Sequence, residues 1–210
     1  MNNNYVIAIT RTCGSGATSI SRILGERLGI NVYDRNLLRL ASDDSGINEE
    51  LFARADEHMK QSLLYRISKK VYNGEIIPPD SNDFTSNDNL FNYQAKVLKE
   101  LAANESFICI GRAADYILKD NPNLITIFIC APMDKCIKRE MELLSFDAKK
   151  AEQHIITTDK YRADFYKYHT GREWKNPENY DLCLNTGKFD YETCVDIIEN
   201  YIKTRLAGNN

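Results

Sequence analysis

Five short apolar segments, separated by longer stretches of helical character, restrict the folds open to this chain of 210 residues. Continuous apolar runs of strand length that alternate with helices are typical of a parallel sheet with both faces covered. The sequence therefore predicts a three-layer α/β fold, with a five-stranded parallel sheet and helices on both faces. The expected strands are residues 5–10, 30–34, 106–110, 124–130 and 180–184.

The spacing of these strands also predicts how the chain is organised. Its length suits one α/β domain over residues 1–210. The widest gap between strands is residues 35–90, which we interpret as an inserted helical subdomain. Within it, residues 51–72 have a helical pattern, whereas residues 77–89 are typical of an irregular loop. Further helices are expected over residues 20–28, 91–103, 134–146, 148–170 and 191–206.

The first strand leads into a glycine turn and then a helix, which is the order of a phosphate-binding loop. Glycines let backbone N–H groups wrap around an anion, and the start of a helix adds unpaired N–H groups. Against the pattern G-x-x-x-x-G-K-[ST], Arg11 stands at the first glycine and Ala17 replaces the lysine. A plain glycine turn between strand and helix is the alternative. The predicted loop consists of Gly14, Ser15, Gly16, Ala17, Thr18 and Ser19.

Charge and segment composition exclude several function classes. The 27 basic and 30 acidic residues give a net charge of −3, which argues against a dominant nucleic-acid surface or a polybasic membrane contact. Neither a signal segment nor an apolar run of membrane length is evident. We therefore expect a cytoplasmic protein without nucleic-acid or membrane partners.

The six cysteines form no C-x-x-C pair, and several lie within apolar runs. We interpret them as reduced, buried small side chains rather than as disulfides or a zinc site. Cys13 is the exception, because its place in the loop could leave it exposed. The three histidines, His58, His154 and His169, lack ligand spacing, so a metal site made by them is not expected.

Five motifs resemble, in their order and spacing, the cytidylate kinase-like family, a branch of the P-loop nucleoside monophosphate kinases. They are Ile9-Thr10-Arg11-x-x-Gly14-Ser15-Gly16, Tyr33-Asp34-Arg35, Gly111-Arg112-x-x-Asp115-Tyr116-Ile117-Leu118, Thr158-Asp159-Lys160-x-Arg162 and Tyr180-Asp181-Leu182-Cys183-Leu184-Asn185. The resemblance covers most of the chain. It implies a P-loop kinase fold and transfer of the γ-phosphoryl group of ATP to a nucleoside monophosphate such as CMP. Well-characterised cytidylate kinases carry the loop lysine that this chain lacks.

For the donor, the resemblance implies that the ATP phosphates lie over residues 14–19 and that Mg²⁺ contacts the hydroxyl of Thr18 or Ser19. Residues 135–175 would form a lid that closes over the donor. Without the lysine, phosphoryl transfer needs magnesium and arginines to meet the developing charge. The candidate catalytic arginines are Arg11, Arg139 and Arg162. The alternatives are that Arg11 pairs with a surface carboxylate and that lid charges are simply solvated.

For the acceptor, the resemblance points to residues after the second and third strands, with the 35–90 insertion choosing the acceptor. Asp34 ends a strand at the carboxyl edge of the sheet, where open α/β sheets bind ligands, although it could equally cap the next helix. A guanidinium after the third strand could grip a phosphate in bidentate fashion. The family shows Gly-Arg-Asp here, whereas this chain inserts two alanines. The candidate acceptor residues are Asp34, Arg35, Arg112, Asp115 and Asp159.

Three functions stay open from the sequence. The first is magnesium-dependent phosphoryl transfer to a small phosphorylated acceptor. The second is a degenerate kinase that binds a nucleotide without turning it over, which the alanine at the lysine position favours. The third is a kinase for a non-nucleotide acceptor. The expected partner is the small-molecule acceptor, with a second copy of the chain as a possible homodimer.

Overall fold

The computed structural model describes residues 4–34, 36–45, 48, 50–51, 76 and 86–207. Its centre is a single five-stranded sheet in the order β2-β3-β1-β4-β5, and each neighbouring pair is parallel. The sheet predicted from the apolar segments is therefore confirmed, with strand ends within two residues of the expected ones. The strands are β1 (Val6–Arg11), β2 (Asn31–Tyr33), β3 (Phe107–Ile110), β4 (Leu124–Cys130) and β5 (Leu182–Asn185).

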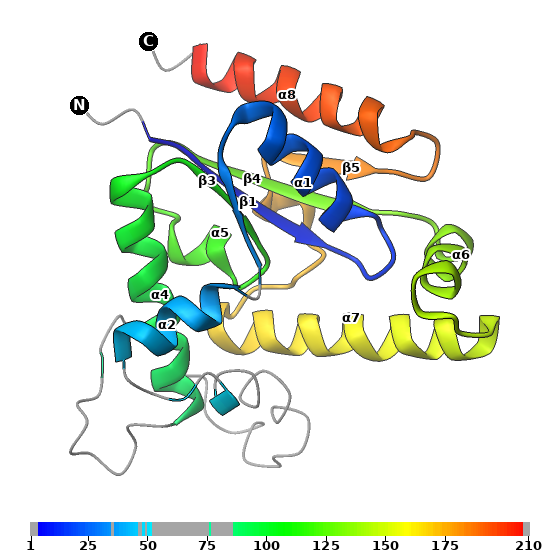
Figure 1. The fold of residues 1–210 in the computed structure, drawn as a ribbon, viewed down its shortest axis with the longest axis horizontal. Coiled ribbons are helices and arrows are strands. Elements are labelled where there is room, and N and C mark those ends of the chain that lie inside the picture. The colour runs from blue at the N-terminus through cyan, green and yellow to red at the C-terminus, as the bar shows by residue number, and fades with distance from the viewer. Residues whose placement is uncertain are drawn as a thin grey trace.

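Both faces of the sheet are buried, which explains why its strands are apolar without alternation. Successive side chains of β1 point to opposite faces, so Ile7 and Ile9 pack in one core and Val6 and Ala8 in the other. Helices α1 (Ala17–Leu28) and α8 (Tyr191–Ala207) contribute to the first core. The second core is covered by α4 (Asn87–Asn104), α5 (Ala114–Ile117) and α2 (Asn36–Ser45), as Figure 1 shows.

Local signals set the ends of several helices. Helix α1 stops at Gly29, whose φ of 65° is the left-handed conformation common after a helix. Helix α4 begins where the Ser86 side chain accepts a hydrogen bond from the N–H of Asn89. Most of the 35–90 insertion, including the expected helix over residues 51–72, lies outside the described residues. The insertion therefore stays a prediction.

Helices α6 (Met133–Leu144) and α7 (Ala148–Thr170) form a hairpin over the predicted lid region. The turn between them contains Ser145, with a φ of 55°, and Asp147, whose carboxylate accepts the N–H of Lys150 and caps α7. In Figure 1 the hairpin lies beyond the end of β1, where the chain leaves the sheet for α1. The fold thus brings the glycine loop and the hairpin to the same edge of the sheet.

Candidate functional site

The glycine loop between β1 and α1 depends on two left-handed glycines. Gly14 has a φ of 71° and Gly16 a φ of 83°, a region that residues with a Cβ rarely adopt. Space is also short, since a Cβ on Gly16 would lie 2.6 Å from the Tyr191 ring. A Cβ on Gly14 would lie 2.7 Å from the carbonyl oxygen of Cys136. Both conformation and packing therefore require glycine at these positions.

The start of α1 offers backbone N–H groups to an anion. The first hydrogen bond of the helix runs from the N–H of Ile20 to the carbonyl of Gly16, at 3.1 Å. The N–H groups of Ala17, Thr18 and Ser19 precede that bond and belong to the unpaired first turn. Ala17 is buried, whereas Thr18 and Ser19 are exposed. Their hydroxyl oxygens suit Mg²⁺, which prefers oxygen and takes few protein ligands beside substrate phosphates. The residues present at this end of α1 thus fit a magnesium–phosphate group.

Arg139 of α6 is hydrogen-bonded to the backbone of the loop. Its guanidinium donates hydrogen bonds to the carbonyl oxygens of Gly14 and Ser15, at 3.2 and 2.8 Å. It also donates to the hydroxyl of Thr186 at 3.0 Å and lies 5.5 Å from the centre of the Tyr191 ring. Because its guanidinium already donates to backbone carbonyls of the loop, Arg139 stabilises the loop conformation in this structure.

Three arginines gather at the carboxyl edge of the sheet beside the loop. Arg11 ends β1 and lies 3.8 Å from the carboxylate of Asp34, and Arg162 of α7 donates to the carbonyl of Arg11 at 3.5 Å. The pKa of Arg11 is lowered to about 10: burial is the largest cause, the charges of Arg162 and Arg112 act in the same direction, and Asp34 opposes them. The gathering of three arginine side chains makes this edge cationic.

Arg112 occupies a strained turn. Gly111, Arg112 and Ala113 are successive left-handed residues, with φ values of 77°, 62° and 52°. Two of them carry a Cβ, and such conformations cost about 1–3 kcal/mol each and cluster at functional sites. The missing Cβ of Gly111 also makes room for Arg11, whose Nη1 would lie 2.2 Å from it. The turn after β3 therefore places two of the three arginines.

Asp159 of α7 contacts the loop itself. Its Oδ1 accepts the N–H of Cys13 at 2.7 Å and a hydrogen bond from Arg162 at 3.3 Å. Burial is the main cause that raises the pKa of Asp159, and the two hydrogen bonds oppose it. The α6–α7 hairpin thus reaches the loop through an acidic and a basic residue one turn apart on α7.

Asp115 lies in the core rather than on the open edge. It is 4% exposed, and its Oδ2 accepts the hydroxyl of Tyr166 at 2.6 Å. Its Oδ1 has no hydrogen-bond partner among the described residues, and burial raises its pKa. A contact between Asp115 and an acceptor stays a prediction. Arg35, another predicted acceptor residue, lies outside the described residues.

A cavity of about 340 Å³ adjoins the loop on the side of α6 and α8. It shares Arg139 and Tyr191 with the loop surroundings, and Lys135, Lys138 and the 45%-exposed Phe189 also line it. Its size is that of a small-ligand pocket, and its lining combines basic and aromatic side chains with the acidic Glu142 and Asp190.

Two features near the loop differ from the sequence interpretation or escaped it. Cys13 is 6% exposed, so the expectation that it could be exposed is wrong; α6 and α7 cover it. Thr186, 1% exposed, donates its hydroxyl to the carbonyl of Ser15 at 2.8 Å and was not predicted. Its only sequence signal is its place directly after the last apolar strand, at the edge where sheet ligands bind.

A glycine loop that leads from the central strand of a parallel sheet into an open helix start defines a phosphate-binding α/β protein. The sequence profile of the Cytidylate kinase-like family matches residues 6–188. This chain belongs to that family, as the resemblance of its motifs predicted.

Individual relatives are more distant. A cytidylate kinase from Fervidobacterium nodosum is 22% identical over 223 residues, covering 95% of this chain and 96% of the kinase. A uronate isomerase from Corynebacterium glutamicum is 28% identical over 107 residues; this match covers 49% of the chain and spans only 20% of the isomerase.

Solved structures share the fold over nearly the whole chain. The crystal structure of an uncharacterized protein from Eubacterium ventriosum is similar with a TM-score of 0.70 and 28% identity, covering 95% of this chain and 99% of that one. A shikimate kinase from Bacteroides thetaiotaomicron has a TM-score of 0.53 and 15% identity, with 95% and 98% covered. The five-stranded architecture of this chain is therefore shared with both of these solved structures.

Proposed function

We propose that this protein is an ATP-dependent phosphotransferase whose acceptor is a nucleoside monophosphate of the CMP type. One observation carries the proposal: Arg11 of β1, Arg112 of the turn after β3 and Arg162 of α7 gather where β1 leads into the glycine loop and α1. N–H groups and the helix dipole would hold the donor phosphates, and the arginines would neutralise charge on the transferred group. The family membership of the chain supports the same reaction class.

The donor would lie across the loop with its base in the cavity beside Arg139 and Phe189. Thr18 and Ser19 would contribute hydroxyl ligands to Mg²⁺. When bound, that ion neutralises phosphate charge and holds the phosphate oxygens in position. The chain itself would position the reactants in line and exclude water, and the α6–α7 hairpin would contribute by closing over the donor.

The acceptor phosphate would meet Arg112 and Asp34 at the carboxyl edge of β2 and β3. Arg112 supplies a planar fork that can bind two phosphate oxygens at once. Asp34, 3.8 Å from Arg11, keeps that guanidinium directed toward the same edge. Residues 35–90 would choose the acceptor, and residues 135–175 would form the lid.

The test is a coupled assay of ADP formation with Mg²⁺, ATP and a panel of CMP, dCMP, UMP, AMP and non-nucleotide acceptors. We expect turnover above the acceptor-free background with a pyrimidine monophosphate. Arg112→Ala should raise the acceptor KM more than it lowers kcat, whereas Arg27→Ala, at the far end of α1, should leave both unchanged. Absence of ADP formation with every acceptor would exclude the proposed reaction.

A second function is favoured by one observation at the loop. Ala17 places a buried methyl group where a P-loop kinase carries its lysine, and the N–H of Cys13 is already bound to Asp159. A nucleotide-binding module without turnover would have these features. Calorimetric binding of ATP together with undetectable ADP formation across the panel would select this function.

A further inference from the structure

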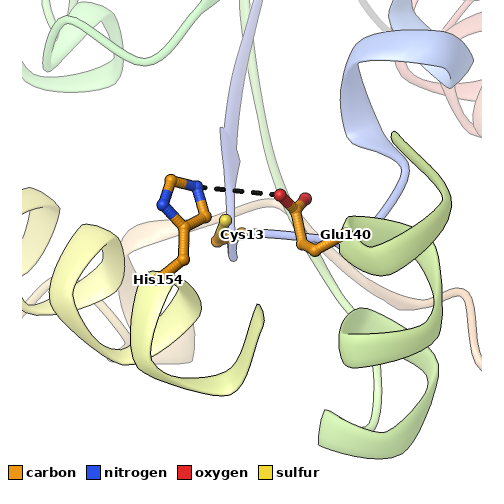
Figure 2. Close-up of side chains that lie close together, drawn as sticks. All are labelled: Cys13, Glu140 and His154. Carbon is orange, nitrogen blue, oxygen red and sulfur yellow. Dashed lines mark ion pairs between the residues drawn. The ribbon is translucent and has the colours of Figure 1, made fainter. Parts of the chain in front are cut away.

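A group of metal-binding side chains lies behind the phosphate loop. Cys13 of the loop, Glu140 of α6 and His154 of α7 bring a sulfur, a carboxylate oxygen and a ring nitrogen within 4.8 Å of one another. Figure 2 shows the three side chains converging from three separate elements. They lie far apart in the sequence, so no local motif predicts the group. The fold alone assembles the group.

The separation of the His154 and Glu140 donors is close to that around a tetrahedral ion. Zinc bonds of about 2.0–2.3 Å to nitrogen, oxygen and sulfur place neighbouring ligand atoms about 3.3–3.7 Å apart at the tetrahedral angle. The Nε2 of His154 lies 3.7 Å from the Oε2 of Glu140. That distance is too long for a strong hydrogen bond but near the separation that two ligands of one ion adopt.

Burial gives a second reason for a cation here. Glu140 is 7% exposed and Cys13 is 6% exposed, and a buried carboxylate is costly unless it is paired. The Cys13 thiol, a weak donor, hydrogen-bonds to Glu140, and desolvation followed by the charge of Glu140 raises the pKa of that thiol to about 12. Half-exposed His154 leaves a route from solvent. Protein groups alone thus compensate poorly for the burial of the Glu140 carboxylate and the Cys13 thiol.

We propose that Cys13, Glu140 and His154 form a binding site for Zn²⁺, with water as the fourth ligand. Thiolate, imidazole and carboxylate together suit zinc, in contrast to the oxygen-only hydroxyls that suit Mg²⁺ at the start of α1. On binding, the S–H bond of Cys13 breaks, its proton passes to the buffer and a sulfur–zinc bond forms, without electron transfer. The bound ion would tie the phosphate loop to both helices of the hairpin.

The site is tested with the full chain, freed of metal by a chelator and titrated with Co²⁺ as a spectroscopic probe and then with Zn²⁺. We expect one Co²⁺ per chain, a thiolate-to-cobalt charge-transfer band, visible bands typical of a tetrahedral ion, and displacement by Zn²⁺. Zn²⁺ should also raise the melting temperature at concentrations at which Mg²⁺ does not.

Variants identify the ligands. Cys13→Ser should abolish the charge-transfer band, and Glu140→Gln and His154→Gln should each weaken Co²⁺ binding about tenfold or more, the least that even outer partners of a metal site contribute. The matched controls are Cys183→Ser and Glu152→Gln, which replace exposed residues of β5 and α7. Should Cys13→Ser not fold, the half-exposed His154→Gln variant decides by the same affinity measurement.

The proposal is overturned if Co²⁺ gives no charge-transfer band, or if the band persists in Cys13→Ser and disappears in Cys183→Ser. Equal affinity in His154→Gln and in the parent chain also overturns it. None of these measurements involves ATP or an acceptor, so the zinc site and the phosphotransferase reaction stand or fall separately.

Discussion

Replacing Arg139 tests whether hydrogen bonds from α6 stabilise the conformation of the phosphate loop. Its guanidinium donates to the carbonyl oxygens of Gly14 and Ser15 and to the hydroxyl and carbonyl of Thr186. Hydrogen bonds from a charged donor contribute about 1.5–3 kcal/mol each, but bonds of one group are not additive and freed carbonyls can recover water. We therefore expect Arg139→Ala to lower the free energy of unfolding by about 2–4 kcal/mol.

The assay is thermal unfolding followed by circular dichroism, with ATP affinity measured by calorimetry. For a chain of this size, 1 kcal/mol shifts the melting temperature by about 2–4 °C, so the expected decrease is about 4–16 °C. ATP affinity should fall as well, because the loop loses its fixed geometry. Arg139→Lys should recover little, since an ammonium cannot reach the same acceptors as a planar fork.

Two comparisons sharpen this result. Arg27→Ala removes an arginine of α1 that pairs with Glu192 and Asp196 at the surface, and it should lower the melting temperature less than Arg139→Ala. Thr186→Val should couple to Arg139→Ala in a double-mutant cycle, because Arg139 donates to the Thr186 hydroxyl and both side chains donate to the carbonyl of Ser15. An Arg139→Ala protein that melts like the parent but has a strongly reduced kcat would refute the stabilising role and return Arg139 to the reacting phosphate.

Three further changes have expected outcomes. Gly16→Val should destabilise the protein and abolish measurable ATP binding in calorimetry, because it strains the left-handed turn and drives a Cβ into Tyr191; unchanged affinity would contradict the phosphate-loop assignment. Gly111→Ala should displace the Arg11 guanidinium and lower the free energy of unfolding by about 1–2 kcal/mol from left-handed strain, seen as a lower urea midpoint. Burial lowers the pKa of His169 to about 3, so the unfolded chain binds the extra proton as pH falls from about 6.5 to about 3, and stability decreases in that window by up to about 1.4 kcal/mol per pH unit. His169→Phe should reduce that acid-side slope in urea titrations at several pH values, and an unchanged slope would exclude His169 as its source.

The sequence predicted those parts of the fold that local patterns determine. Strands buried on both faces appear as continuous apolar runs, and Gly29 and Asp147 mark helix ends through capping that depends on a few neighbouring residues. Contacts between distant segments left no such pattern. The hydrogen bond from Arg139 to Ser15 spans 124 residues, and the burial of Cys13 depends on helices more than 100 residues away.

The proposed function makes α7 part of the phosphate site as well as part of the lid over it. A lysine in the loop would keep a positive charge next to the phosphates at every position of the α6–α7 hairpin. Here Ala17 supplies no charge, and the guanidinium of Arg162 reaches the loop only while α7 stays bound through Asp159 to the N–H of Cys13. Phosphate charge at the loop would therefore be met fully only when the hairpin is in place. Transfer chemistry on this chain should accordingly be more sensitive to the position of α7 than in a kinase whose loop retains its lysine.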